Sequence, residues 1–353
     1  MKSYDISEWG KPLQLAVRET PLPGPQEVLL RLLYCGVCHT DVHIQQGYFD
    51  MGGGIRSNFA DRMKLPFVLG HEPVGVVAAV GSQVRGVEVG ETCLVNPWIG
   101  CGHCALCLNG QDNLCNASAS IGIARPGGFS THLLVPHSRY LIDVQGLDPA
   151  QTAVLACSGV TAYAAASKLA PPQKGQWVAV IGSGGLGLIA IAILRALGHE
   201  NIIACDIDDN KLEAAGTGGA RHVLNLKTSG AAELLSLAGG GLRSMLDFVG
   251  APSTVALALP GLQKGGRFVA VGLFGGAATI PIVALATREI SFLGSVAGRT
   301  AQIRELVAMV RSGKLTLPEV QMRPLSQAEQ SLRDLEAGRV TGRIVLDAMT
   351  EAA

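Results

Sequence analysis

The fold is decided by one stretch, Trp177-Val178-Ala179-Val180-Ile181-Gly182-Ser183-Gly184-Gly185-Leu186-Gly187. Its first five residues are apolar and predict a strand that is covered on both faces. Its last six residues have the spacing Gly-x-Gly-x-x-Gly, and the apolar segment that continues to Leu197 predicts a helix. A strand, a glycine-rich turn and a helix in this order are typical of a dinucleotide-binding unit.

The glycines of this turn have separate tasks. Gly182 permits the sharp turn, Gly184 lets the backbone approach a pyrophosphate, and Gly187 allows the helix to pack closely on the strand. Asp206 closes the next predicted strand, where a carboxylate binds the ribose hydroxyls of NAD. The residues just after it include two more acidic groups and no Arg, so repulsion of a 2′-phosphate favours NAD over NADP. The alternative is a glycine-rich packing turn that binds no ligand.

The rest of the chain changes character near residue 159. Beyond this point continuously apolar segments alternate with helical ones, which predicts an α/β domain with a doubly wound parallel sheet. Further strands of this sheet are expected at 201–205, 222–224, 245–249, 267–271 and 290–293. Before residue 159, short apolar segments bounded by Gly or Pro predict a β-rich domain. Within it, residues 50–64 are expected to form a surface loop.

Four cysteines, Cys101, Cys104, Cys107 and Cys115, follow the spacing C-x2-C-x2-C-x7-C. Four thiolates complete the tetrahedral shell of one Zn²⁺ and leave no open position, so this pattern predicts a structural zinc. The alternative is four unrelated buried thiols. The segment argues against it, because it is rich in Gly, Asn and Gln and lacks apolar periodicity.

Composition narrows the possible functions. The chain has 353 residues, enough for about two domains, and a formal net charge of zero. Nucleic acid and anionic membranes are therefore poor candidates for partners. The N-terminal residues lack a signal-peptide pattern, and the most apolar run, 186–197, is too short to span a membrane. Nine cysteines in such a chain indicate a reducing compartment, so we expect a cytoplasmic protein.

Three more residues stand in short motifs: Cys38 in Gly36-Val37-Cys38-His39-Thr40-Asp41, His71 in Gly70-His71-Glu72, and Cys157 in Cys157-Ser158-Gly159-Val160-Thr161. Taken singly, each is more simply a core residue, and spacing alone does not connect them. Together with the four cysteines and the glycine-rich turn, in this order, the motifs resemble the zinc-dependent alcohol dehydrogenases of the medium-chain dehydrogenase/reductase family. The resemblance spans nearly the whole chain.

This resemblance implies a catalytic zinc bound by Cys38, His71 and Cys157, the two-cysteine, one-histidine ligand set known from alcohol dehydrogenases. A water or the substrate oxygen would take the fourth position. The alcohol would give a hydride to NAD and leave an aldehyde or ketone. Zinc and NAD are therefore the expected cofactors.

The resemblance also assigns four polar residues to the reaction. Asp41 would orient the zinc-bound His71, and Glu72 would lie behind the metal, with a plain surface carboxylate as its alternative. Thr40 would accept the substrate proton, and His43 would pass it to solvent, a task suited to a group that titrates near neutrality.

The cofactor is expected to contact residues from both parts of the chain. The resemblance assigns His39 and Arg343 to the pyrophosphate, and Lys211 to the adenosine ribose beside Asp206. It assigns Thr161, Val271 and Leu273 to the nicotinamide carboxamide, Leu186 to the apolar wall behind that ring, and Gly185 to the phosphate-binding turn. For Arg343 the alternative is a solvated residue on an edge strand.

The resemblance implies two domains with the active site in the cleft between them. Residues 159–294 would form a Rossmann-type NAD-binding domain, inserted into a β-rich, GroES-like catalytic domain of residues 1–158 and 295–353. Related bacterial and fungal enzymes suggest a homo-oligomer, either a tetramer or a dimer.

The substrate is less well defined. Phe49 and Trp98 are candidates for the substrate pocket, although both are also explained as core aromatics. Their apolar character favours simple or aromatic alcohols over the polyols of a related zinc polyol dehydrogenase. The extra length at 51–64 leaves the substrate class open. A non-catalytic NAD-binding protein is the alternative of a different class, but it would be expected to have lost a catalytic ligand.

Overall fold

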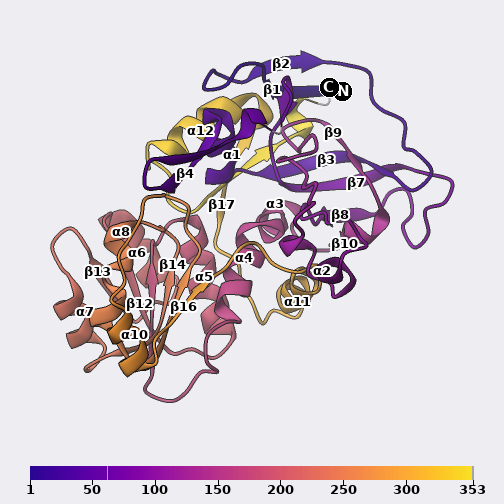
Figure 1. The fold of residues 1–353 in the computed structure, drawn as a ribbon. Coiled ribbons are helices and arrows are strands. Elements are labelled where there is room, and N and C mark those ends of the chain that lie inside the picture. The colour runs from indigo at the N-terminus through magenta and orange to yellow at the C-terminus, as the bar shows by residue number, and fades with distance from the viewer. Residues whose placement is uncertain (62, 352–353) are drawn as a thin grey trace.

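The computed structural model describes residues 1–61 and 63–351, which form two lobes that lie side by side (Figure 1). One lobe contains a six-stranded parallel sheet, and the other contains the three remaining sheets. The two ends of the described chain meet, since Lys2 Nζ lies 3.6 Å from Glu351 Oε2. In the described part of the chain, no helix is both long enough and apolar enough to cross a bilayer.

The parallel-sheet lobe has the strand order β13-β12-β11-β14-β15-β16, with every neighbouring pair parallel. Its strands are β11 (Trp177–Ile181), β12 (Asn201–Asp206), β13 (His222–Asn225), β14 (Leu242–Asp247), β15 (Leu262–Ala270) and β16 (Ser291–Gly294). Its helices are α5 (Gly185–Ala196), α6 (Asp209–Thr217), α7 (Ala231–Leu237), α8 (Pro252–Val255), α9 (Ala258–Gly261) and α10 (Ile282–Arg288). The order reverses between β11 and β14, and the carboxyl ends of strands at such a point form a ligand crevice.

The expected strand, turn and helix are found at 177–196. Val178 to Ile181 of β11 are buried, and the apolar face of α5 covers the sheet beside them. A Cβ atom on Gly187 would lie 2.0 Å from the carbonyl oxygen of Gly182, so only glycine allows this approach of helix and turn. The doubly wound α/β prediction is confirmed.

The mixed-sheet lobe contains a seven-stranded sheet of order β10-β8-β7-β3-β18-β17, in which β9 also pairs with β3. The strands of this sheet are β3 (Val28–Gly36), β7 (Glu72–Val80), β8 (Thr92–Val95), β9 (His132–Val135), β10 (Leu141–Asp143), β17 (Val320–Pro324) and β18 (Arg343–Asp347). A smaller sheet joins β1 (Lys2–Ile6), β2 (Gln14–Val17) and β6 (Phe67–Val68).

The remaining helices pack around this lobe and between the lobes. They are α1 (His39–Gln46), α2 (Ala105–Leu108), α3 (Pro149–Ala153), α4 (Ser158–Ala166), α11 (Thr300–Arg311) and α12 (Ala328–Glu336). Short 3₁₀ helices lie at Phe59–Asp61, Asp112–Leu114, Ser138–Tyr140, Val154–Ala156, Leu325–Gln327 and Met349–Glu351.

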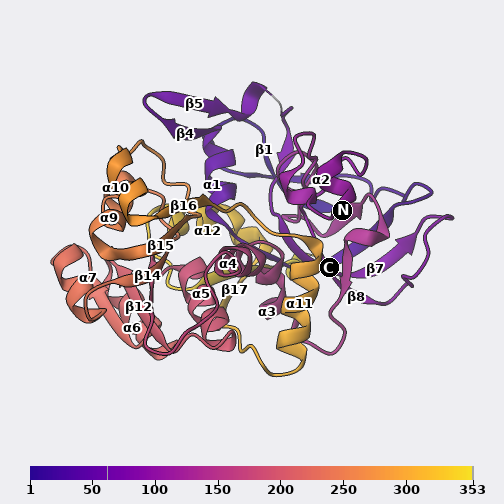
Figure 2. The ribbon, with the colours of Figure 1, turned by 60° about the horizontal axis from the view of Figure 1, so that its bottom comes forward.

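The segment expected as a surface loop at 50–64 is largely a β-hairpin, formed by β4 (Tyr48–Gly52) and β5 (Ile55–Asn58). The expectation of a plain loop was wrong because Gly52, Gly53 and Gly54 all have positive φ angles and make a tight turn. Figure 2 shows this hairpin projecting beyond α1. Residue 62 of the segment lies outside the described residues.

Candidate functional site

Four polar side chains converge in the mixed-sheet lobe. Cys38, His71, Glu72 and Cys157 each offer a ligand atom, and these atoms lie within 4.8 Å of one another. All four residues are buried. Cys38 caps the start of α1, His71 and Glu72 stand at the start of β7, and Cys157 caps the start of α4. The fold thus brings together three motifs that sequence spacing could not connect.

The environment of His71 fits a metal ion. Its Nδ1 atom lies 3.0 Å from Oδ1 of Asp41, and Asp41 also accepts hydrogen bonds from the backbone N–H groups of Cys38 and Gly70. The Nε2 atom of His71 is buried without a hydrogen-bond partner among the described residues. A buried nitrogen without a partner is costly, and this one faces two thiols. Thiolate sulfur and imidazole nitrogen are the donors that Zn²⁺ prefers.

Glu72 and Arg343 form a buried ion pair beside the thiols. Oε2 of Glu72 accepts from Nη2 of Arg343, and Oε1 accepts from the backbone N–H and the hydroxyl of Ser158. Burial raises the pKa of Glu72, and Arg343 opposes this shift. Both alternatives for these residues are therefore excluded: Glu72 is no surface carboxylate, and Arg343, only 6% exposed, is not solvated.

Arg343 also touches the glycine-rich turn. A Cβ atom on Gly185 would lie 2.3 Å from Cδ of Arg343. One buried arginine therefore contacts both the metal cluster and the N-terminus of α5. Its side chain has an Nε–H group with no partner in the described part of the chain. A phosphate oxygen is the kind of acceptor that an arginine donor pairs with.

The glycine-rich turn has room for a ligand. A Cβ atom on Gly184 would meet nothing within 4 Å, whereas Gly182 has a φ of +87° and closes the turn. The 12-residue helix α5 begins directly after Gly184, so its free N–H groups face this open space. At the end of β12, Oδ2 of Asp206 accepts from the N–H of Ser183, 2.7 Å away. The arrangement fits a dinucleotide phosphate.

The other cofactor candidates surround these two centres. Thr161 lies one turn into α4, where its N–H donates to the carbonyl of Cys157 at 2.8 Å. Val271 is buried after β15, but Leu273 is 54% exposed. Leu186 and Lys211 are half-buried at the starts of α5 and α6. Partial desolvation lowers the pKa of His39, Cys38 opposes this shift, and the Arg343 and Lys211 charges add to it.

The proposed reaction and pocket residues make two separate ring contacts. The ring of His43 lies 5.1 Å from Phe49, and the ring of Trp98 lies 6.0 Å from His71. Nε1 of Trp98 donates to the carbonyl of Ala156, the residue before Cys157. Burial lowers the pKa of His43. Thr40 is half-buried in the first turn of α1, between Cys38 and His43.

The four-cysteine segment folds into a second cluster. Sγ of Cys101 lies 4.0 Å from Sγ of Cys107, and Sγ of Cys104 lies 3.9 Å from Sγ of Cys115. Sulfurs at about 2.3 Å from a tetrahedral Zn²⁺ are roughly 3.8 Å apart. Backbone N–H groups of His103 and Cys104 lower the pKa of Cys101 to about 6, which favours its thiolate. The donor set fits zinc.

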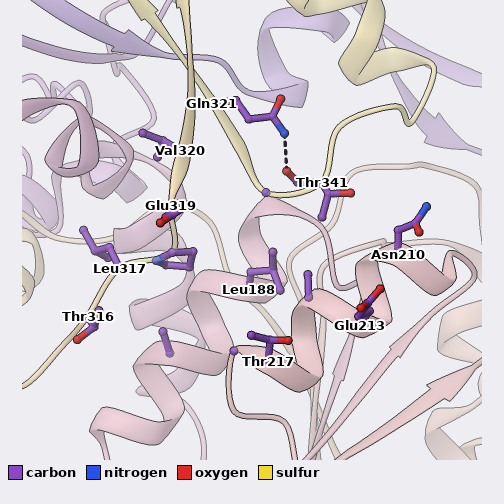
Figure 3. Close-up of a pocket in the computed structure, with 15 residues that line it drawn as sticks. Leu188, Asn210, Glu213, Thr217, Thr316, Leu317, Glu319, Val320, Gln321 and Thr341 are labelled. Carbon is purple, nitrogen blue, oxygen red and sulfur yellow. Dashed lines mark hydrogen bonds between the residues drawn. The ribbon is translucent and has the colours of Figure 1, made fainter.

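A groove of about 770 Å³ lies away from both clusters. Figure 3 shows it between α5 and α6 on one side and residues 316–321 on the other, with Nε2 of Gln321 bonded to the carbonyl of Thr341. Glu213 and Glu319 lie on its walls. None of the described residues that line the groove belongs to either cysteine cluster. The groove is therefore not the candidate active site, although it is large.

Sequence reasoning missed two polar residues of this region. Ser158 holds Glu72, and Asn96 is completely buried between Trp98 and Thr300. Ser158 follows a predicted ligand directly, which was a usable signal. Asn96 had none, since a single Asn after a strand is ordinarily a turn residue.

Known proteins match this chain along nearly its whole length. Residues 24–146 match the family model of the alcohol dehydrogenase GroES-like domain, and residues 185–312 match that of zinc-binding dehydrogenases. The NAD-dependent alcohol dehydrogenase of Sulfurisphaera tokodaii is 33% identical over 348 residues, which cover 98% of this chain and 99% of the relative.

Two solved structures share the fold. The crystal structure of the Aeropyrum pernix alcohol dehydrogenase superposes with a TM-score of 0.88 at 32% identity, covering 98% of this chain and 100% of that one. The acetophenone reductase of Geotrichum candidum, solved in complex with NAD, gives 0.84 at 32% identity, covering 98% and 96%.

Proposed function

Because the chain belongs to the zinc-binding alcohol dehydrogenase family, we propose that it oxidises primary or secondary alcohols reversibly to aldehydes or ketones, with NAD as the hydride acceptor. The observation that carries this proposal is the buried Nε2 atom of His71, which has no hydrogen-bond partner among the described residues and lies beside the thiols of Cys38 and Cys157. Zinc held there by Cys38, His71 and Cys157 would lower the pKa of an alcohol hydroxyl, and bound NAD would be the hydride acceptor.

The ligand residues hold this zinc in a neutral site. Two thiolates, from Cys38 and Cys157, balance the charge of Zn²⁺, and His71 adds a neutral nitrogen. Asp41 accepts the Nδ1–H of His71, which leaves Nε2 free to face the metal. Glu72 stays behind the cluster, restrained by Ser158 and Arg343.

Proton transfer is the task of α1. The hydroxyl oxygen of Thr40 would accept the substrate proton while its own proton is released. His43 would pass that proton, by way of the cofactor ribose, to solvent. The lowered pKa of His43 supports this role, because its imidazole is neutral and ready to accept a proton at physiological pH.

The cofactor lies across both lobes. Gly182, Gly184, Gly185 and Gly187 shape the phosphate-binding turn, and Asp206 accepts from the adenosine ribose. His39, Lys211 and Arg343 supply the basic groups. The Nε–H of Arg343, which has no partner in the part of the chain that the structure describes, supports this role. Around the nicotinamide we place the side chains or backbone of Thr161, Leu186, Val271 and Leu273.

The domain division 1–158 and 295–353 against 159–294 is part of the proposal. It is supported by the parallel sheet, all of whose strands fall between residues 177 and 294. Cys101, Cys104, Cys107 and Cys115 hold a second, structural zinc. We also propose a cytoplasmic homo-oligomer, a tetramer or a dimer. All nine cysteines lie among the described residues, and none of them forms a disulfide bond, which fits a reducing compartment.

Phe49 and Trp98 shape the substrate pocket. Their apolar rings favour simple or aromatic alcohols, and the name of the Geotrichum relative gives acetophenone as a fitting ketone. The test is a panel of primary, secondary, allylic, benzylic and polyol substrates, followed by NADH absorbance. Oxidation of some alcohols, abolished by Cys38→Ser in a folded protein, supports the proposal. No turnover with any member of the panel overturns it.

A further inference from the structure

A short connector, residues 295–299, leads from the last strand of the parallel sheet to α11, which begins at Thr300. Its course from β16 past α4 can be followed in Figure 2. Ala297, in the middle, is buried and has a φ of 46°. A left-handed alanine is strained, and such strain persists only where the surroundings impose it. The contacts of the connector show what imposes it here.

Two asparagines bind this segment, one at the connector and one at the first residue of α11, and each stands near one of the two cysteine clusters. Nδ2 of Asn113 donates to the carbonyl of Val296 at 3.0 Å, and Asn113 stands two residues before Cys115 in the four-cysteine lobe. Nδ2 of Asn96 donates to the hydroxyl of Thr300 at 2.7 Å. Oδ1 of Asn96 accepts from the N–H of Trp98, whose ring lies against His71.

The connector also packs directly on the helix that starts at the catalytic cluster. A Cβ atom on Gly298 would lie 2.4 Å from Cγ2 of Val160 and 3.0 Å from its carbonyl oxygen. Val160 is on α4, between Cys157 and Thr161. A shift of the connector would therefore move the helix that carries one metal ligand and one cofactor contact.

Two buried polar atoms at the connector lack hydrogen bonds within the described part of the chain. Oδ1 of Asn113 and Oγ of Ser295 are buried without a hydrogen-bond partner among the described residues. Native proteins rarely leave such groups unpaired, and each case calls for a reason. Both atoms belong to the contact between the connector and the four-cysteine lobe, since Asn113 bonds Val296, the neighbour of Ser295.

We propose that Asn113 and Asn96 are positioning residues for hydride transfer. They fix the connector, so that the four-cysteine lobe helps to set how the NAD-binding lobe sits against the catalytic zinc. The inference rests on the proposed function. On this proposal, the four-cysteine lobe contributes to cofactor binding as well as to the stability of the protein.

The direct test compares Asn113→Ala with Asn109→Ala, an exposed position of the same lobe. NADH binding is measured by fluorescence titration, together with zinc content, KM for NAD and kcat. Loss of one average hydrogen bond should weaken NADH binding about fivefold in Asn113→Ala, with a matching rise in KM for NAD. Zinc content should stay at the wild-type value. NADH binding equal in the two variants would overturn the proposal.

A second pair covers the case in which Asn113→Ala loses its structural zinc. Thr300→Val removes the hydroxyl that Asn96 binds but keeps the shape of the side chain, whereas Thr300→Ser keeps the hydroxyl. Weaker NADH binding in Thr300→Val, restored in Thr300→Ser, supports the proposal, and equal binding in both contradicts it. The NADH titrations need no turnover, so they test the positioning role by itself. Alcohol oxidation is measured separately in the control variant Asn109→Ala. A failure of the positioning role can therefore be told apart from a failure of the proposed function.

Discussion

The Nδ1 atom of His71 lies 3.0 Å from Oδ1 of Asp41, and neither side chain is exposed to solvent. The contact fixes the ring so that Nε2 faces Cys38 and Cys157. A carboxylate behind a metal-binding histidine sets its tautomer and raises its basicity as a ligand. The position of Asp41 on α1 thus determines how His71, at the start of β7, is oriented toward the metal site.

Replacing this carboxylate should weaken only the catalytic zinc site. We expect Asp41→Asn to lower the affinity of that zinc by about 10- to 100-fold, the usual effect of removing such a partner. Zinc release to a chromogenic chelator measures it. The structural zinc should leave at the wild-type rate, and release of both ions with unchanged kinetics would refute this assignment.

The two cysteine clusters should respond differently to substitution. Cys104→Ser removes a ligand from the closed site, so we expect the loss of about one zinc per chain and a lower midpoint of thermal unfolding. Cys38→Ser should abolish alcohol oxidation while the structural zinc remains. Metal analysis and calorimetry of both variants check this. A Cys104→Ser protein with full zinc content and unchanged stability would argue against a structural zinc.

Two glycines of the phosphate-binding turn should separate folding from binding. Gly187→Ala places a Cβ atom 2.0 Å from the carbonyl oxygen of Gly182, so this variant should be strongly destabilised. Gly184→Ala meets no protein atom within 4 Å. It should fold normally but bind NADH at least about tenfold more weakly, because the methyl group enters the space of the pyrophosphate. Normal NADH binding by Gly184→Ala would place the phosphates elsewhere.

Local pattern was enough for much of this fold. The strand Trp177–Ile181 was expected with its observed bounds, because continuous apolarity and a glycine-rich turn leave few other structures. The hairpin at 48–58 was not expected, since Gly52, Gly53 and Gly54 are as typical of a loop as of a tight turn.

His43 contributes to the pH dependence of stability. Burial holds its pKa below the usual 6.5, so the unfolded chain binds a proton there that the folded chain rejects. The contribution of His43 to the free energy of unfolding should therefore be full above pH 6.5 and fall as the pH decreases below it. In His43→Gln this slope should be smaller, as urea titrations of the zinc-loaded proteins at several pH values can measure. An unchanged slope would contradict the shift.

The same residue should matter for the reaction. General acid–base groups contribute about 10²-fold or more to rates, so His43→Gln should lower kcat by that order and leave zinc content intact. Added imidazole should restore part of the loss. A variant with wild-type kcat would exclude His43 from the proton path.

The contacts that join the site could not be read from local pattern. Glu72 and Arg343 pair across 271 residues, and Asn96 and Thr300 across 204. Hydrophobic periodicity indicates which face of a strand is buried, but it does not indicate which polar groups meet inside. For the metal ligands, family resemblance connected motifs whose separate alternatives were ordinary core residues.

The central claim is that one zinc ion lies between Cys38, His71 and Cys157. Diffraction data collected on both sides of the zinc absorption edge from crystals of the purified protein test it most directly. The account predicts an anomalous peak in contact with both sulfurs and Nε2 of His71, and a second peak among the four cysteines of the 101–115 segment. A map with zinc at the second position alone, in protein that oxidises alcohols, would contradict it.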